Sequence, residues 1–356
     1  MTGCLNLPEE KSIFSAMPSE NSVIISQTLR IMALTTALTA LIFTVNNYLI
    51  FWQGWPGVIN LFSHFSWLGL EQLKSPLTSS DIVLGFIQCG LYLAGMVGVT
   101  LFSTLLPLRT LTTDAELLAN VAAFIARAAF WSVLLVGVVD MIISFLRVED
   151  LLKDLLGEYL ATQLGRPTYR GNYIHYPLIG LSLVIASRSR SLGFSWLALL
   201  IVLAEFQIVI SRFVFSYEQA FMGDLVRFWY AALFLFASAY TLLHEGHVRV
   251  DILYAGMNKK KKAWSNTVGS LLLGVPLCWI IMTSGMWNKS NLINAPLLSF
   301  EITQSGYGLY VKYLMAAFLL VYALAMLMQF LGYTLRNAAV LLGDTDAKPV
   351  SAQQDH

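Results

Sequence analysis

Seven long apolar stretches constrain the fold of this chain more than any other feature. Each is close to the roughly 20 residues that an α-helix needs to cross the hydrocarbon core of a bilayer. They lie at Ile31–Phe51, Ile82–Leu108, Val121–Phe145, Leu192–Phe215, Leu225–Leu243, Val268–Met286 and Tyr310–Leu331. A lipid-facing strand would leave its backbone groups unpaired, and the alternating pattern of a membrane barrel is absent, so we expect all seven to be helices. With 57% hydrophobic and 12% charged residues, the chain is predicted to be an all-α integral membrane protein.

An eighth apolar segment, Tyr176 to Ser187, is shorter and follows His175. Its length is typical of a re-entrant or interfacial segment. Cytoplasmic loops are enriched in Lys and Arg, and this rule allows two orientations. With seven crossings the N-terminus lies outside, and the cytoplasmic excess of basic residues is larger. If the short segment also crosses, the N-terminus lies inside and the excess is smaller. Both orientations place Lys259–Lys262 and the C-terminus in the cytoplasm.

One surface helix is predicted between the third and fourth long spans. Acidic and basic residues, among them Glu149 and Lys153, face one side of it. Apolar residues at helical spacing occupy the other side, at Val148, Leu151, Leu152, Leu155, Leu156, Tyr159 and Leu160. We expect this amphipathic helix to rest on the bilayer or on neighbouring spans rather than to recruit a partner.

Four ionisable residues fall inside the predicted spans, where a charge is costly and is therefore usually paired or functional. They are Arg127, Asp140, Glu205 and Arg212. Glu205 and Arg212 are seven positions apart, hence on one helix face, and favour a structural pair or a contact between helices. A proton or ion relay through the carboxylates of Asp140 and Glu205 remains an alternative. Asp224 is predicted to cap the fifth span and to complement its dipole.

The loop after the fifth span contains His244, His247 and Asp251, which would share one face if the loop were helical. In a zincin the two histidines are four apart and enclose a glutamate, whereas these are three apart and enclose Glu245 and Gly246. We therefore expect a polar loop rather than a metal site. No Ser or Cys nucleophile accompanies a base, and a net charge of +1 gives no field for nucleic acid. The sequence predicts no enzyme, no cofactor, no metal and no nucleic-acid partner.

The most specific motif extends from Leu225 to Tyr254 and reads LVRFWYAALFLFASAYTLLHEGHVRVDILY. It resembles the small membrane subunit of tripartite ATP-independent periplasmic (TRAP) transporters, the DctQ-like family. The segment from Ser305 to Lys312 resembles the segment that precedes the last helix in that family. The positions that match the family's pattern in and around the loop are Arg212, Asp224, Gly246, His247, Arg249, Val250 and Asp251.

The resemblance implies a four-span small permease domain over residues 192–336. A three-span extension would precede it over 1–146, followed by an amphipathic and interfacial linker over 147–191, and a cytoplasmic tail would occupy 337–356. The resemblance does not assign a role to the extension.

The resemblance also implies a supporting role in secondary active transport across the bacterial inner membrane. Such a subunit packs against a large multi-span permease, which carries the sodium-coupled substrate path, and helps to dock a periplasmic solute-binding protein. The expected function is therefore uptake of an organic acid, with membrane lipids as further contacts. The alternative is a stand-alone ion-coupled carrier or channel that uses Arg127, Asp140 and Glu205.

The residues of the motif suggest how it acts. Gly246 lets the chain leave the fifth helix in a conformation that other residues disfavour. Arg249 and Asp251 are placed to contact lipid phosphate or the end of a partner's helix, and Lys259–Lys262 meet anionic headgroups. We hypothesise that this loop fixes the helical hairpin and contributes to the interface with the large permease.

Overall fold

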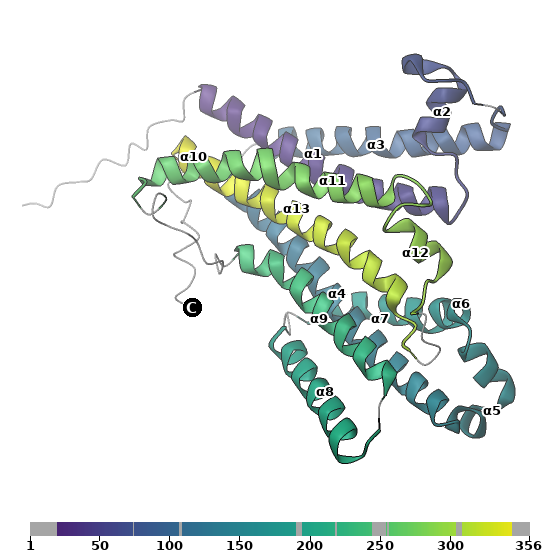
Figure 1. Cartoon of the computed structure of the whole chain (residues 1–356). Helices are drawn as coiled ribbons and strands as arrows, with labels where there is room; N and C mark the ends of the chain where they lie inside the picture. Colours follow the sequence, from purple (N-terminus) through teal and green to yellow (C-terminus); the bar gives the residue numbers. More distant parts are fainter. Residues whose placement is uncertain are drawn as a thin grey trace, which may run out of the picture.

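Long helices dominate the structure, a computed structural model that describes residues 20–73, 75–106, 109–189, 194–217, 219–243, 254, 256–303 and 308–343. Every regular element in these ranges is a helix (Figure 1). Among the described residues, seven helices are long and apolar enough to cross a membrane. They are α1 (Glu20–Phe51), α3 (Ser79–Leu105), α4 (Leu111–Val148), α8 (Phe194–Val214), α9 (Ala220–Leu243), the continuous run of α10 (Lys259–Gly269), η3 (Ser270–Gly274) and α11 (Val275–Met286), and α13 (Lys312–Leu342). The prediction of an all-α membrane protein with seven long spans is confirmed.

Shorter elements connect these spans. Between α1 and α3 lie α2 (Val58–His64) and η1 (Trp67–Gly69), and α12 (Asn294–Ser299) lies between α11 and α13. Between α4 and α8 lie α5 (Leu151–Leu164), α6 (Pro167–Arg170), η2 (Gly171–His175) and α7 (Tyr176–Arg188). The last three form one unbroken helical stretch, because the residues at both junctions keep right-handed helical dihedrals. The short segment predicted at Tyr176 to Ser187 is therefore the second part of a longer helix.

Capping residues explain where several helices begin and end. The Thr78 side chain accepts a hydrogen bond from the backbone N–H of Asp81, and the Asp81 side chain accepts one from the backbone of Thr78, which closes a capping box on α3. Thr110 caps α4 by accepting from the N–H of Thr113. At a helix end, Gly343 terminates α13 with a positive φ of 80°, a conformation that favours glycine.

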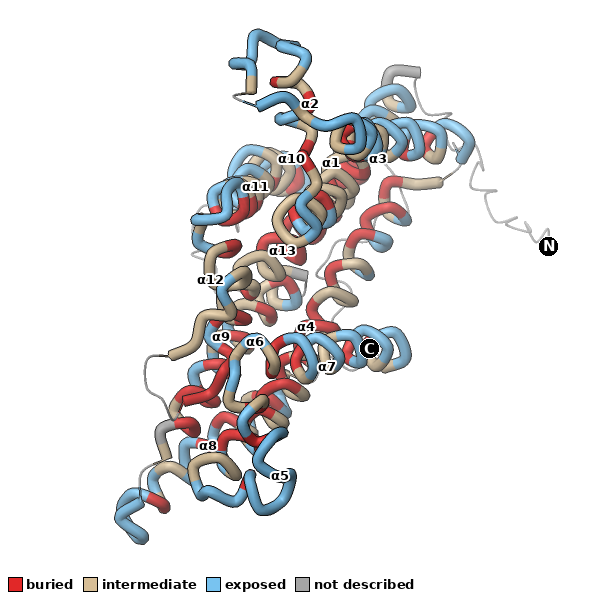
Figure 2. Tube along the Cα trace, turned by 90° about the vertical axis from the view of Figure 1, so that its right-hand side faces the viewer, coloured by how far each residue is buried: buried red, intermediate tan, exposed pale blue. Residues whose placement is uncertain are grey.

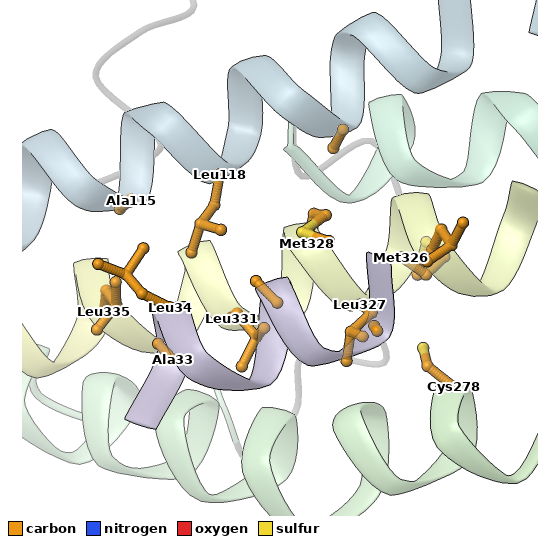
Figure 3. Close-up of a cluster of buried hydrophobic side chains, with 14 of the residues drawn as sticks. Ala33, Leu34, Ala115, Leu118, Cys278, Met326, Leu327, Met328, Leu331 and Leu335 are labelled. Carbon is orange, nitrogen blue, oxygen red and sulfur yellow. The ribbon is translucent and has the colours of Figure 1, made fainter. Parts of the chain in front are cut away.

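The core of the bundle lies where α4 and α13 pack along each other, with α9 on one side and α1 on the other. Figure 3 shows the part of this core between α1, α4, α11 and α13, to which Leu34, Leu118, Cys278 and Leu331 belong. Gly332 allows a close approach of α13 to α4, because a Cβ there would lie 3.1 Å from the carbonyl oxygen of Ala115. Figure 2 shows buried residues concentrated on these inner helices, whereas α3 and α8 are largely exposed.

The helix α4 shows how the chain folds back after its third span. Asp140 of α4 contacts His175, Ser132 contacts Ser182 at 2.6 Å, and the ring of Phe130 meets that of Phe194 at the start of α8. η2 and α7 therefore run antiparallel to α4, and α8 begins beside the middle of α4. The following α8 returns toward the other end of α4.

Tyr217, just beyond α8, donates a hydrogen bond to Glu149, just beyond α4. This bond raises the pKa of the Tyr217 hydroxyl. It also fixes the end of α8 beside the end of α4.

The starts of α1 and α10 and the end of α13 lie at one end of the bundle, which we call the Lys259 end (Figure 1). Arg30 of α1 contacts Asp114 near the start of α4, and Asn266 of α10 bonds Asn337 of α13 at 3.2 Å. The opposite end, where α4 and α11 finish and α13 begins, is the Asp140 end. Of the two orientations allowed by the sequence, this arrangement supports the one with the start of α1 on the side of Lys259.

The predicted amphipathic helix is present as α5. Leu152 and Leu164 are buried against the end of α4, whereas Leu155 and Tyr159 are exposed at 63% and 73%. Gly157, with φ of 81°, interrupts the helix and turns its second half. Only part of the predicted apolar face therefore packs on protein, and the rest is available to the bilayer.

Candidate functional site

A buried ion pair between Asp140 and Arg170 forms the centre of a polar cluster at the Asp140 end. The carboxylate oxygen Oδ1 of Asp140 lies 2.8 Å from Nη1 of Arg170 and 3.1 Å from Nε2 of His175. The other oxygen, Oδ2, accepts a hydrogen bond from the backbone N–H of Tyr310 at 2.8 Å. The side chains of Asp140, Arg170 and His175 are completely buried. Both oxygens of the carboxylate thus have donors from the chain itself.

Arg170 is equally well satisfied. Its Nε and Nη2 donate to the carbonyl oxygen of Leu164 at 3.0 and 2.8 Å, and its Nη1 also donates to Ser144. Its guanidinium lies 4.1 Å from the ring centroid of Tyr310, a favourable cation–π arrangement. A buried ion pair is stable only with such additional bonds, since removing two charges from water is costly. The cluster is therefore built to hold charge in place.

The backbone at η2 brings His175 into the cluster. This single π-helical turn widens the helix between α6 and α7, and Nδ1 of His175 reaches the hydroxyl of Tyr313 at 2.9 Å. Gly171 permits a close contact with the end of α12, because a Cβ there would lie 2.3 Å from the ring of Phe300. The cluster joins α4, α6, η2 and the start of α13, and it acts as a clamp between distant parts of the chain.

A second acidic group, Asp224 of α9, lies near the same end. Its Oδ2 accepts from the backbone N–H of Leu309 at 3.2 Å and from the hydroxyl of Thr303 at 3.1 Å, and its Oδ1 lies 3.3 Å from Arg227. The predicted cap role is wrong, because α9 begins at Ala220 and Asp224 lies one turn inside. The carboxylate instead holds the segment that leads into α13.

Next to Asp224 is a pocket of about 510 Å³ that is lined in part by Arg227, Glu301 and Lys312. Lys312, the first residue of α13, pairs with Glu301 at 2.6 Å, and both side chains are nearly half exposed. Arg227 is 74% exposed. This end of the bundle therefore presents charges of both signs to the outside.

The remaining predicted intramembrane charges do not join these clusters. Arg127 is half-buried near the middle of α4, and its Nε is buried without a hydrogen-bond partner. It lies about 20 Å from Asp140 along the helix, at 1.5 Å per residue. Glu205 and Arg212 are exposed on α8, and no ion pair joins them in the described structure. The structure does not assemble Arg127, Asp140 and Glu205 into one polar path.

The signature residues Gly246, His247, Arg249, Val250 and Asp251 lie outside the described residues, as do His244 and Glu245. The lysines that follow are described at the start of α10. Asn258 caps this helix by accepting from the N–H of Lys261 at 2.9 Å, and Lys262 lies 5.1 Å from the ring centroid of Tyr254. Lys259 to Lys261 are exposed.

Sequence reasoning missed a third charged cluster, at the Lys259 end. Asp114 is completely buried between Arg30, at 2.6 Å, and Arg109, at 2.7 Å. The apolar pattern puts Arg30 just before the first span and Asp114 between two spans. Both helices extend beyond the predicted apolar limits, and this extension buries the two residues. The partners of Asp140 were missed because Arg170 comes from a connecting segment and Tyr310 from the start of the last predicted span, both distant from Asp140 in the sequence.

The fold and its charges define a class. The chain is a multi-span helical membrane protein whose buried carboxylates are paired internally, and the described residues contain no cluster of His, Cys, Asp and Glu that could hold a metal.

The family assignment comes from residues 199–339, which match the family model of the tripartite ATP-independent periplasmic transporters, DctQ component. This part of the chain is a DctQ domain, and the DctQ family is the small permease component of TRAP transporters, a transporter component and not an enzyme. The domain bounds of 192–336 stay a prediction. No curated protein and no solved structure matches the chain.

Proposed function

We propose that this protein is a scaffold subunit that supports a large permease during sodium-coupled uptake of an organic acid. A periplasmic solute-binding protein delivers the substrate, and the large permease carries it. The observation that supports this division of labour is the saturation of the buried carboxylates: Asp140 and Asp114 both bond donors within the chain. A transport path needs polar groups that can exchange partners near the middle of the membrane.

The orientation follows from the lysines of α10. Lys259–Lys262 favour the cytoplasm, and the end of α13 lies at the same end of the bundle. The C-terminus is therefore assigned to the cytoplasm and the Asp140 end to the periplasm. There the exposed charges Arg227, Glu301 and Lys312 surround a pocket and are available to the binding protein.

Charge reversal tests this docking role. Arg227→Glu and Lys312→Glu are expected to raise the KM for the substrate-loaded binding protein several-fold in proteoliposomes of the complete transporter, more at low than at high salt. Lys260→Glu, at the opposite end, is the matched control and is expected to leave KM unchanged. Equal KM values in all variants would exclude the docking surface.

We assign the interface with the large permease to the signature loop, with Arg249 and Asp251 as its polar contacts. The exposed side of α8 is assigned to the same interface, with Arg212 as a further contact near the Asp140 end. Co-purification tests it. Arg249→Ala with Asp251→Ala is expected to release the permease from the tagged subunit, whereas Arg188→Ala retains it. Retention by both would contradict this interface.

Reconstitution tests the whole assignment. The chain alone is expected to give no sodium-driven uptake of labelled dicarboxylates or other carboxylates, and the complex with the permease and the binding protein is expected to give it. Uptake by the chain alone would instead support the stand-alone carrier.

A further inference from the structure

Glu205 lies near the middle of α8, a helix at the outer edge of the bundle (Figure 1). It is the twelfth of the 21 residues of that helix. At 1.5 Å per residue this position is roughly 16 Å from the first residue and roughly 14 Å from the last. The hydrocarbon core of a bilayer is about 30 Å thick, so Glu205 lies at its most apolar depth. A glutamate side chain is too short to reach either interface from there, unlike the longer Lys and Arg side chains near helix ends.

No group of the chain itself pairs with this carboxylate. The helix α8 packs along α9, and this contact buries Leu197, Ile201 and Ala204. Glu205 is exposed, and within the described ranges no hydrogen bond or ion pair reaches it. Arg212 lies on the same face but roughly 10 Å further along the helix. The charge of Glu205 therefore needs a partner from outside the chain.

Lipid does not supply this partner. Val202 and Phe206, beside Glu205, are 63% and 61% exposed. A helix that faces lipid presents such apolar side chains, so their exposure alone indicates no protein contact. The carboxylate differs from them, because the cationic groups of phospholipids lie in the headgroup region, about 15 Å from the middle of the hydrocarbon core. A charge at mid-depth is costly and usually pairs with another protein group.

A second copy of the chain does not supply the partner either. Two copies in one membrane have the same orientation, so the two-fold axis of a closed dimer runs along the membrane normal. Such an axis places equal residues at equal depth. Glu205 would then face Glu205, and Arg212 would face Arg212. The charges on this side of α8 are therefore not complementary to themselves.

We propose that Glu205 pairs with a lysine or arginine at mid-depth on a membrane helix of the large permease. The inference rests on the proposed function for the identity of that protein and on charge complementarity for the chemistry of the contact. Arg212, two turns nearer the Asp140 end, meets an acceptor on the same helix. A polar contact of this kind fixes the register of two helices, which apolar packing specifies less strictly.

Energy transfer between the labelled full chain and the labelled permease, measured in liposomes as lipid is added, gives the strength of their association. Glu205→Gln keeps the shape of the side chain and removes its charge. It is expected to weaken the association by about tenfold or more, because the cation of the permease then remains unpaired in the membrane. The unfolding midpoint of the isolated Glu205→Gln chain is expected to stay unchanged, which separates loss of the contact from loss of the fold.

Gln207 provides the matched control. It is exposed two positions from Glu205, and its amide bonds within α8, to Ser211 at 3.1 Å. At about 100° per residue it lies on the other side of the helix at nearly the same depth. The exchange variant, Glu205→Gln with Gln207→Glu, keeps the composition and turns the carboxylate away. It is expected to associate as weakly as Glu205→Gln, whereas Gln207→Leu is expected to associate like the unaltered chain.

Photo-crosslinking in native membranes identifies the occupant directly. Benzoylphenylalanine is placed instead of Val209, which is one turn from Glu205 and 48% exposed, so that the carboxylate is retained. It is expected to join α8 to a helix of the permease. Peptide mapping is expected to find a lysine or arginine within about one turn of the joined residue.

The inference is wrong if Glu205→Gln or the exchange variant binds the permease as tightly as the unaltered chain. It is also wrong if the crosslinker captures a second copy of the chain, or lipid alone, while the permease remains bound. In each of these cases the scaffold role stands, because the permease still associates. An unaltered chain that does not associate with the permease would contradict the scaffold role and this inference together.

Discussion

Asp140 and Tyr310 lie 170 positions apart, and the backbone N–H of Tyr310 donates to Oδ2 of Asp140 over 2.8 Å. This bond fixes the segment that leads into α13 against α4. Arg170 and His175 hold the other oxygen of the same carboxylate. One buried side chain therefore fixes three parts of the chain that are distant in sequence.

Asp140→Asn is expected to destabilise the bundle strongly. The substitution keeps the shape of the side chain but leaves Arg170 as a buried charge without a counterion, which costs roughly 3–5 kcal/mol. Adding Arg170→Met to Asp140→Asn is expected to recover part of this loss, because the uncompensated charge is then absent. Unfolding midpoints in a denaturant titration measure both effects. Glu205→Gln, on the exposed side of α8, is the control, and equal midpoints for it and Asp140→Asn would refute the clamp.

Substitution by methionine is predicted to change the stability of the chain differently at Arg127 and at Arg170. Arg127 lies in α4 without a carboxylate partner among the described residues, and its Nε is unsatisfied, so Arg127→Met removes a costly group. We expect the stability of the isolated chain to change by less than about 1 kcal/mol or to rise. Arg170→Met leaves Asp140 uncompensated and costs roughly 3–5 kcal/mol. Similar losses for both variants, measured by thermal unfolding, would show that Arg127 has a partner in this chain.

Gly332 is predicted to be essential for the contact between α13 and α4. A side chain there meets the carbonyl oxygen of Ala115, so Gly332→Leu forces the helices apart and is expected to cost about 1–3 kcal/mol. The control is Gly90→Leu on α3, where a Cβ has no neighbour within 4 Å. The unfolding midpoint is expected to fall only for Gly332→Leu, and a fall of equal size for both would assign the effect to helix propensity or to lipid contact.

The sequence was sufficient to locate the long spans, because a membrane helix needs about 20 apolar residues to cross the bilayer. Such a segment must also pair its backbone polar groups internally, which makes it a helix. The sequence did not predict the partners of Asp140, since Arg170 and His175 belong to a connecting segment and only the fold brings them to α4. It missed the burial of Arg30 and Asp114 for a related reason. Helices continue beyond their apolar part wherever polar residues find partners on a neighbouring helix.

The two ends of α4 give the last prediction, which concerns the orientation of the chain. In a cysteine-free background, single cysteines at Val23, Tyr159 and Lys260 report on α1, α5 and α10. Val23 and Lys260 lie at the Lys259 end. Tyr159 lies at the opposite end, because α5 packs against the end of α4. A membrane-impermeant maleimide added outside intact spheroplasts is expected to label Tyr159→Cys several-fold faster than the other two. Lysis is expected to equalise the three rates. Fast external labelling of Val23→Cys would instead place the start of α1 outside and restore the seven-crossing arrangement.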